Sequence, residues 1–154
     1  MKKFSPLLIS GFLLMSAIGC TPPSRTSADA PSNVNETANA PAQETAQKNQ
    51  NDATSETRKD QIESDIRARE QRNNATGGDA DRDKADLESE VRGKLEVNLP
   101  ASQLTVQAKD GAVTVAGTVP TQEQLSKIPT LAKEIKGVKS VKVDAKVAPA
   151  KPTN

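Results

Sequence analysis

Cys20 is the only cysteine among the 154 residues, and it is the side chain best suited to covalent chemistry. A single cysteine permits no internal disulfide and no cysteine-based zinc site. The chain also has no histidine, so it lacks the usual general base and the commonest metal ligand. At this point four roles are open to Cys20: a nucleophile, half of an intermolecular disulfide, a buried filler, or a point of attachment.

Carboxylates are the other candidates for chemistry. Asp86 and Glu90 lie in an amphipathic stretch, and we expect them on the exposed face of a helix. No base, nucleophile or metal ligand accompanies them there, and a small domain offers little room for a pocket. We therefore expect no catalytic residue, no metal, no cofactor and no enzymatic activity.

The segment before Cys20 has the pattern of a secretory signal peptide. Lys2 and Lys3 give it a positive start, and residues 7–19 are apolar or small (LLISGFLLMSAIG). This run is too short for a comfortable membrane span, which needs about 20 residues. An N-terminal core helix is the alternative, but small residues close the run as they do before a cleavage site. We predict that residues 1–19 are a signal peptide.

The stretch Ala17-Ile18-Gly19-Cys20 resembles the lipobox of bacterial lipoproteins, although that family prefers Leu where this chain has Ala17. The resemblance implies that the Cys20 thiol carries a diacylglyceryl group and that its new amine is acylated, with palmitate as a typical chain. Each buried CH₂ contributes about 0.8 kcal/mol, so two or more chains make a durable anchor. Thr21, in place of Asp, favours the outer over the inner membrane of the bacterial envelope, facing the periplasm.

Residues 20–82 are predicted to be a lipidated cysteine followed by a disordered polar linker. The part from 21 to 52 has one Val and no other large apolar residue, so it buries too little surface to offset chain entropy. Residues 54–72 differ, because Ile62 and Ile66 lie four apart among charged residues. A short helix within the linker is one interpretation, and a coiled-coil or partner-binding helix is the other. No heptad is sustained, which favours the first.

A folded domain is predicted from about residue 83, beginning with a helix and a hairpin. Leu87, Val91 and Leu95 recur every four residues, as in an amphipathic helix. Residues 104–119 then alternate between apolar and polar on both sides of Asp110-Gly111. Asp-Gly is a strong hairpin signal, because both residues tolerate positive φ.

A second helix and a last strand complete this domain. Thr121 and Gln124 form a capping-box pattern, and Pro129 is expected to kink or restart the helix. Residues 141–147 alternate again, and 148–154 are expected to be a disordered tail. The predicted fold class is α+β: a small αββαβ domain, with two helices on one face of a three-stranded sheet.

Residues 83–147 resemble a BON domain (bacterial OsmY and nodulation). In that family a strand–Asp-Gly–strand–Gly hairpin is followed by a helix ending in Gly-Val and by a closing strand. The matching positions are Asp110, Gly111, Val113, Val115, Gly117, Val119, Gly137, Val138 and Val141. Pro129 and Val143-Asp144 depart from the pattern. The resemblance implies a non-enzymatic envelope module, associated with osmotic or envelope stress, that binds phospholipid or partner proteins.

The glycines of this motif also have structural interpretations, which we favour over ligand contact. Gly111 suits a turn, Gly117 suits close packing or a bulge, and Gly137 suits the residue after a helix, with Val138 as its apolar contact. Each falls where backbone geometry favours glycine.

Charge is the remaining signal. The balance of 21 basic and 20 acidic residues argues against a nucleic-acid protein. Residues 127–151, however, contain seven lysines and two acidic residues. Within them the candidate phospholipid-binding residues are Lys136, Lys139, Lys142 and Lys146.

These four lysines leave two functions open. Near an anionic surface each lysine contributes about 1 kcal/mol. In the first function, the domain of the lipid-anchored protein therefore contacts membrane phospholipid through these lysines. In the alternative they are a solvated face whose edge lysines discourage strand pairing. The protein is then an interaction or scaffold lipoprotein that binds a periplasmic protein partner.

Overall fold

The sheet is built on the hairpin predicted at Asp110-Gly111. The computed structural model describes residues 24–78 and 82–152, so the predicted signal peptide and Cys20 lie outside the described residues. Strands β2 (Gln103–Lys109) and β3 (Ala112–Val119) pair antiparallel. Asp110 has φ 53° and Gly111 φ 84°, the positive values that a tight hairpin turn requires.

A crossover helix makes the last strand parallel to its neighbour. Helix α4 (Gln122–Lys133) carries the chain back along the sheet, and β4 (Ser140–Val147) then pairs parallel with β3. A further strand, β1 (Ser24–Arg25), pairs antiparallel with β2, so the sheet order is β1-β2-β3-β4. The α+β class and the αββαβ order are confirmed, and β1 adds an edge strand to the three that were predicted.

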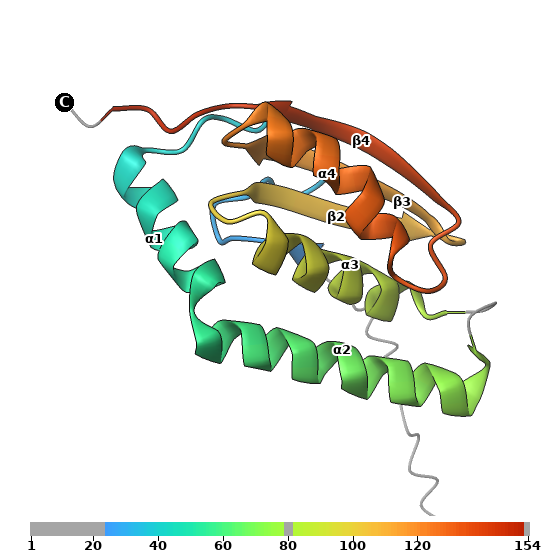
Figure 1. The fold of residues 1–154 in the computed structure, drawn as a ribbon. Helices are drawn as coiled ribbons and strands as arrows, with labels where there is room; N and C mark the ends of the chain where they lie inside the picture. The colour runs from blue at the N-terminus through green and yellow to red at the C-terminus, as the bar shows by residue number, and fades with distance from the viewer. Residues whose placement is uncertain (1–23, 79–81, 153–154) are drawn as a thin grey trace, which may run out of the picture.

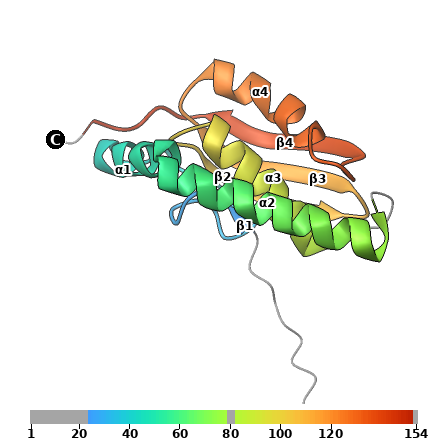
Figure 2. The same cartoon turned by 60° about the horizontal axis from the view of Figure 1, so that its bottom comes forward.

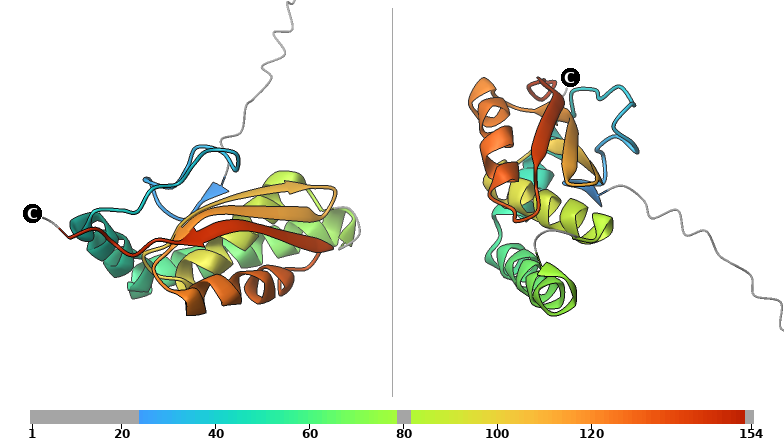
Figure 3. Two further views of the ribbon diagram at one scale, coloured as in Figure 1. Left: turned by 90° about the horizontal axis from the view of Figure 1, so that it is seen from above. Right: turned by 90° about the vertical axis from the view of Figure 1, so that its right-hand side faces the viewer.

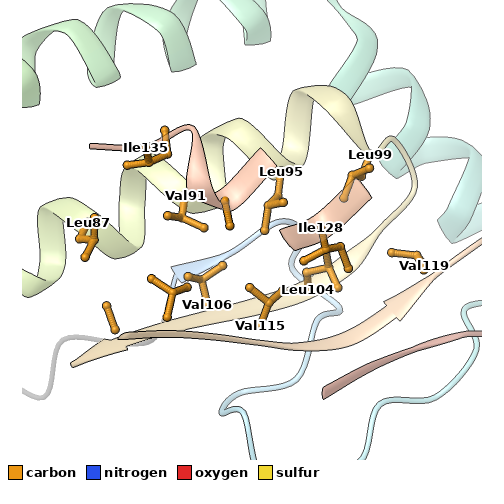
Figure 4. Close-up of a cluster of buried hydrophobic side chains, with 13 residues drawn as sticks. Leu87, Val91, Leu95, Leu99, Leu104, Val106, Val115, Val119, Ile128 and Ile135 are labelled. Atoms are coloured by element: carbon orange, nitrogen blue, oxygen red, sulfur yellow. The ribbon is translucent and has the colours of Figure 1, made fainter. Parts of the chain in front are cut away.

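The core lies between the sheet and two helices on one of its faces, as predicted (Figure 1). Helix α3 (Lys84–Asn98) begins at Asp83, whose side chain accepts hydrogen bonds from the amides of Ala85 and Asp86. Figure 4 shows the apolar side chains of α3 facing those of the strands. The buried cluster consists of Leu87, Val91, Leu95, Leu99, Leu104, Val106, Ala108, Val113, Val115, Val119, Ile128, Ala132 and Ile135.

Helix α4 differs in two details from its predicted form. Thr121 caps it as expected, accepting a hydrogen bond from the Gln124 amide at 3.2 Å. The helix runs through Pro129 and ends at Lys133. The prediction that Gly137 directly follows the helix is therefore wrong, because a turn over residues 134–137 separates them.

The predicted disorder of the linker is wrong for residues 24–78. They contain α1 (Gln43–Thr54) and α2 (Glu56–Thr76), and α2 includes residues 56–72 of the short helix expected over 54–72. Figure 2 shows α2 lying alongside α3. The reason is that Ile62, which is 3% exposed, packs closely against Gly93 of α3. Ile66 also approaches Gly93, and these apolar contacts together with several ion pairs replace the broad apolar stripe that the segment lacks.

The loop between β1 and α1 packs on the sheet face opposite to α3 and α4 (Figure 3). Thr105, which points to that face, is completely buried and donates its hydroxyl hydrogen bond to the Pro31 carbonyl. The Thr26 hydroxyl accepts a hydrogen bond from the Leu104 amide at 2.9 Å. These hydrogen bonds give the Leu104 amide and the Thr105 hydroxyl of β2 a partner, and they hold the loop against the sheet.

The predicted disorder of the tail is wrong for residues 148–152. The Lys151 amide donates to the Pro41 carbonyl at 2.8 Å, and the Lys151 carbonyl accepts from the Gln43 amide at 3.0 Å. The tail is thus tied by backbone hydrogen bonds to the start of α1. Among the described helices, none has the length and apolar character needed to cross a membrane.

Candidate functional site

The four predicted lysines lie at one edge of the sheet and in the loop that leads to it. Lys136 and Lys139 belong to the segment between α4 and β4, and Lys142 and Lys146 belong to β4 itself. Alternation along β4 turns Lys142 and Lys146 to the outer face, while its valines face the helices. All four lysines are exposed, so the structure brings them to one accessible border of the domain.

The lysines make this border basic, but one carboxylate lies among them. The Lys142 ammonium lies 2.8 Å from the carboxylate of Asp144, which occupies the outer face between Lys142 and Lys146. Among the described residues, no carboxylate oxygen lies within the 4.0 Å ion-pair distance of Lys136, Lys139 or Lys146. Three of the four charges are therefore free to meet an external anion.

The motif residue Gly111 positions Lys139. Its amide donates to the Gly111 carbonyl at 2.8 Å. A Cβ on Gly111 would lie 2.8 Å from the Lys139 Cδ and 2.9 Å from the Gly137 carbonyl oxygen. Glycine at the turn thus leaves room for the Lys139 side chain. Asp110, Gly111, Gly137 and Lys139 line one shallow hollow of about 530 Å³.

Gly117 and Gly137 have contacts that explain them structurally. A Cβ on Gly117 would lie 2.0 Å from the Gln103 carbonyl oxygen of the neighbouring strand. A Cβ on Gly137, at φ 90°, would lie 2.7 Å from Cδ of Arg82. Val138 is half-buried against the core cluster. Both glycines thus have structural reasons, although that of Gly137 is its approach to Arg82 rather than a place directly after the helix.

The prediction that Asp86 and Glu90 lie on an exposed helix face is wrong. Glu90 is completely buried, and its Oε2 accepts a hydrogen bond from Arg82 at 2.5 Å. Burial raises the pKa of the Glu90 carboxyl, outweighing the attraction of the Arg82 guanidinium. Asp86 accepts hydrogen bonds from two arginines of α2, Arg69 and Arg72. For Asp86 the cause is α2, which covers a side of α3 that periodicity assigned to solvent, whereas Glu90 is paired with Arg82, just before α3.

Sequence reasoning also missed two buried glutamates. Arg58 of α2 donates two hydrogen bonds to Glu96, at 2.6 and 3.2 Å, and Glu96 is 3% exposed. Glu88 accepts the Ala108 amide of β2 at 2.7 Å. Gly93, within an otherwise regular helical stretch, was the one available signal that something approaches α3 closely. All these carboxylates serve packing and charge pairing.

The feature that the described residues present most clearly is charge at an exposed surface. Among residues 24–78 and 82–152, no group of three or more His, Cys, Asp or Glu side chains is placed to hold a metal ion. The exposed lysine border suits the binding of an anionic partner, such as a headgroup or an acidic protein surface.

Comparison with known proteins agrees with the fold. Residues 83–149 match the family model described as BON domain. A curated protein described as "Osmotically-inducible protein Y", from Escherichia coli (strain K12), is 40% identical over 60 residues. That alignment covers 38% of this chain and 30% of the relative, so the likeness concerns one domain of each.

Proposed function

Residues 83–149 of this chain are a BON domain, and from that premise we propose that the protein is a lipid-anchored component of the bacterial envelope. In this proposal the BON domain is a non-enzymatic module that contacts membrane phospholipid in envelope maintenance or osmotic stress protection. The printed name of the relative, an osmotically inducible protein, supports the physiological setting. The observation that carries the proposal is the exposed border formed by Lys136, Lys139, Lys142 and Lys146.

The sequence around Cys20 and the position of β1 both support a lipid anchor at Cys20. Cys20 follows a signal-like apolar run, and β1 begins only four residues later, at Ser24. Four extended residues reach about 14 Å, so acyl chains on Cys20 would hold the domain close to the bilayer. Three strand spacings, also about 14 Å, separate β1 from β4. A bilayer that holds the anchor is therefore within reach of the lysine border.

Mass spectrometry of the intact protein tests the anchor. Protein extracted from bacterial membranes should have lost residues 1–19 and should carry acyl chains on Cys20, because the lipobox resemblance implies both. Separation of inner and outer membranes should place it in the outer fraction. A protein that retains residues 1–19, or whose Cys20 is a free thiol, contradicts the anchor.

Vesicle co-sedimentation tests phospholipid contact by the domain. Residues 21–154 keep every described element and lack the cysteine, so the anchor contributes nothing. We expect this protein to bind vesicles of phosphatidylglycerol and phosphatidylethanolamine at low salt, and not vesicles of phosphatidylcholine. Changing Lys136, Lys139, Lys142 and Lys146 to Gln should weaken binding at least about tenfold, since each charge contributes about 1 kcal/mol.

A matched variant controls for net charge. Lys48, Lys59, Arg67 and Lys127 lie on α1, α2 and α4, outside the hollow that Lys139 lines, and changing them to Gln removes the same charge. This variant should retain most of the binding. Absence of binding at low salt, or equal loss in both variants, contradicts phospholipid contact through the border.

One observation favours the second function, binding of a periplasmic protein partner. Asp144 divides the lysines of β4 and pairs with Lys142. An anionic bilayer gains nothing from a carboxylate at that position, whereas a protein surface with charges of both signs does. If vesicles do not bind, this alternative becomes the better account of the same border.

A further inference from the structure

We propose that the free edge of β4 pairs antiparallel with β4 of a second copy, about a two-fold axis at Val143. The two sheets then become one continuous sheet across a symmetric dimer. This inference goes beyond the proposed function and does not depend on the anchor or on phospholipid. It rests on an open strand edge and on the order of charges along it.

The edge is open along the whole strand. Only β3 pairs with β4 in the described part of the chain, and Figure 1 shows β4 at the border of the sheet. The amides of Ser140 and Ala148, one at each end, donate to carbonyls of the β3 side, those of Gly111 and Val119. A parallel ladder uses alternate residues, so the even-numbered ones bond to β3. The odd-numbered residues, Val143 among them, direct their N–H and C=O groups to the free edge.

The charges on the outer face complement themselves in one register. With Val143 opposite Val143 of the second copy, Lys142 lies opposite Asp144 of that copy, and Asp144 lies opposite its Lys142. These are non-hydrogen-bonded pairs, in which side chains approach most closely across an antiparallel ladder. The two exposed Lys142–Asp144 pairs, one within each copy, are therefore exchanged for two pairs between the copies.

Neighbouring registers are less favourable. A centre at residue 142 places two Lys142 side chains opposite each other, and a centre at 144 opposes two Asp144 side chains. A centre at 145 restores opposite charges but aligns fewer residues, because β4 ends at Val147. The register at Val143 combines charge matching with the longest overlap.

The helix side of the strand also gains from pairing. Val141, Val143, Ala145 and Val147 pack against the core but remain half-buried. In the proposed register, Val141 lies opposite Ala145 of the second copy, and the two Val143 side chains meet at the axis. Further apolar surface is thereby removed from water.

Charge exchange at two positions tests the dimer. Sedimentation velocity of the full chain, in a density-matched detergent over a range of concentrations, should show a reversible dimer. Lys142→Asp alone and Asp144→Lys alone should each raise the dissociation constant at least about tenfold, because each opposes like charges twice. The two single variants mixed together should form a heterodimer, and the double variant Lys142→Asp/Asp144→Lys should again dimerise.

Glu123 and Lys127 provide the control, because they form an exposed pair on α4, away from the edge. Lys127→Asp and Glu123→Lys make the same charge changes and should leave dimerisation unaltered. Circular dichroism of each variant reports whether the fold is retained. A chain that stays monomeric overturns the proposal. So does a dimer that tolerates both single variants, or a mixture of them that fails to associate.

Discussion

Gly117 shows how one residue of the family motif is required by a neighbouring strand. It lies opposite Leu104 in the β2–β3 ladder and has φ 130°. The Gln103 carbonyl oxygen is 2.0 Å from where a Cβ would be. Both the backbone conformation and the contact exclude a side chain, and the contacting atom is backbone, which cannot rotate away.

Replacing Gly117 with Ala should therefore be strongly destabilising. Residues held in such sparsely populated conformations cost about 1–3 kcal/mol, and the clash adds to this, so we expect about 3 kcal/mol or more. Urea unfolding followed by circular dichroism measures it. Gly77→Ala is the matched control, since a Cβ added there would have nothing within 4 Å, and it should change stability little. Equal effects of the two substitutions would contradict this interpretation of Gly117.

The Arg82–Glu90 ion pair is the most buried charge pair among the described residues. Their side chains are 1% and 0% exposed. Nε and Nη2 of Arg82 and Oε1 of Glu90 have no hydrogen-bond partner there. Removing two charges from water with incomplete pairing costs much of what their attraction returns.

Breaking this pair and replacing it should have different effects. Glu90→Gln leaves an unpaired buried guanidinium, and we expect a loss of about 3–5 kcal/mol in the free energy of unfolding. The double variant Arg82→Met/Glu90→Leu removes both charges and should be neutral or more stable than the natural protein. Chemical denaturation of the natural protein, Glu90→Gln and the double variant measures the three free energies of unfolding. A double variant as unstable as Glu90→Gln would contradict the expectation.

The raised pKa of Glu90 also predicts a pH dependence. A carboxyl whose pKa is higher in the folded than in the unfolded chain binds more protons when folded. The stability that this extra proton binding gives the folded chain is fully present below the ordinary pKa of 4.5. It is lost as the pH rises through the raised pKa. The free energy of unfolding of the natural protein minus that of the double variant should thus be larger at pH 4 than at pH 7. Denaturation of both proteins at the two pH values measures this difference, and its absence or the opposite sign counts against a raised pKa.

At the scale of elements, the contact between α2 and α3 determines whether the N-terminal segment is ordered. A Cβ on Gly93 would lie 2.8 Å from Cγ2 of Ile62, so the two helices approach closely at this point. Around it, Arg58 and Arg69 of α2 reach carboxylates of α3. The helix is held by the approach of Ile62 and Ile66 to Gly93, surrounded by charge pairs, a combination that hydrophobic periodicity does not reveal.

Ile62→Ala should loosen α2 without unfolding the sheet. Truncating a buried Ile costs about 2–5 kcal/mol, and here the loss falls on one helix contact. Hydrogen exchange should become faster in the amides of α2, while the amides of β2 and β3 keep their protection. Gln61→Ala, at an exposed neighbouring position, is the control and should not alter exchange. Uniformly faster exchange throughout the chain would mean that α2 and the domain unfold together.

At the scale of the whole molecule, the fold extends beyond the family match. The match begins at residue 83, whereas residues 24–78 supply β1, the loop on the outer sheet face and two helices. They cover Thr105 on the sheet and the carboxylates of Asp86 and Glu96 on α3. The N-terminal segment therefore works as part of the domain rather than as a flexible spacer.

A chain reduced to residues 82–154 should fold less stably than residues 24–154. It loses the Ile62 contact and three arginine partners, and we expect the free energy of unfolding to fall by about 2 kcal/mol or more. The denaturant dependence should also become shallower, since less surface is buried on folding. Urea titration of both fragments provides the comparison. Equal stability would show that residues 24–78 rest on the domain without supporting it.

Local sequence patterns predicted the order of elements from residue 83 and the residues at several of their ends. Leu87, Val91 and Leu95 predicted α3, Asp110-Gly111 predicted the turn, and Thr121 predicted the cap of α4. These signals are local: each depends on residues within one or two turns of a helix, or on the alternation of a single strand. The attachment of lipid to Cys20 also follows from sequence alone and remains a prediction.

Which polar groups are buried, and which segments before residue 83 are ordered, depends on the three-dimensional packing. Arg58 and Glu96 are 38 residues apart, and Thr26 and Leu104 are 78 apart, so no local pattern connects them. Burial of Glu96 and order in residues 24–78 depend on such long-range contacts. Such contacts arise from the shapes of two surfaces together, whereas composition and periodicity describe one surface at a time.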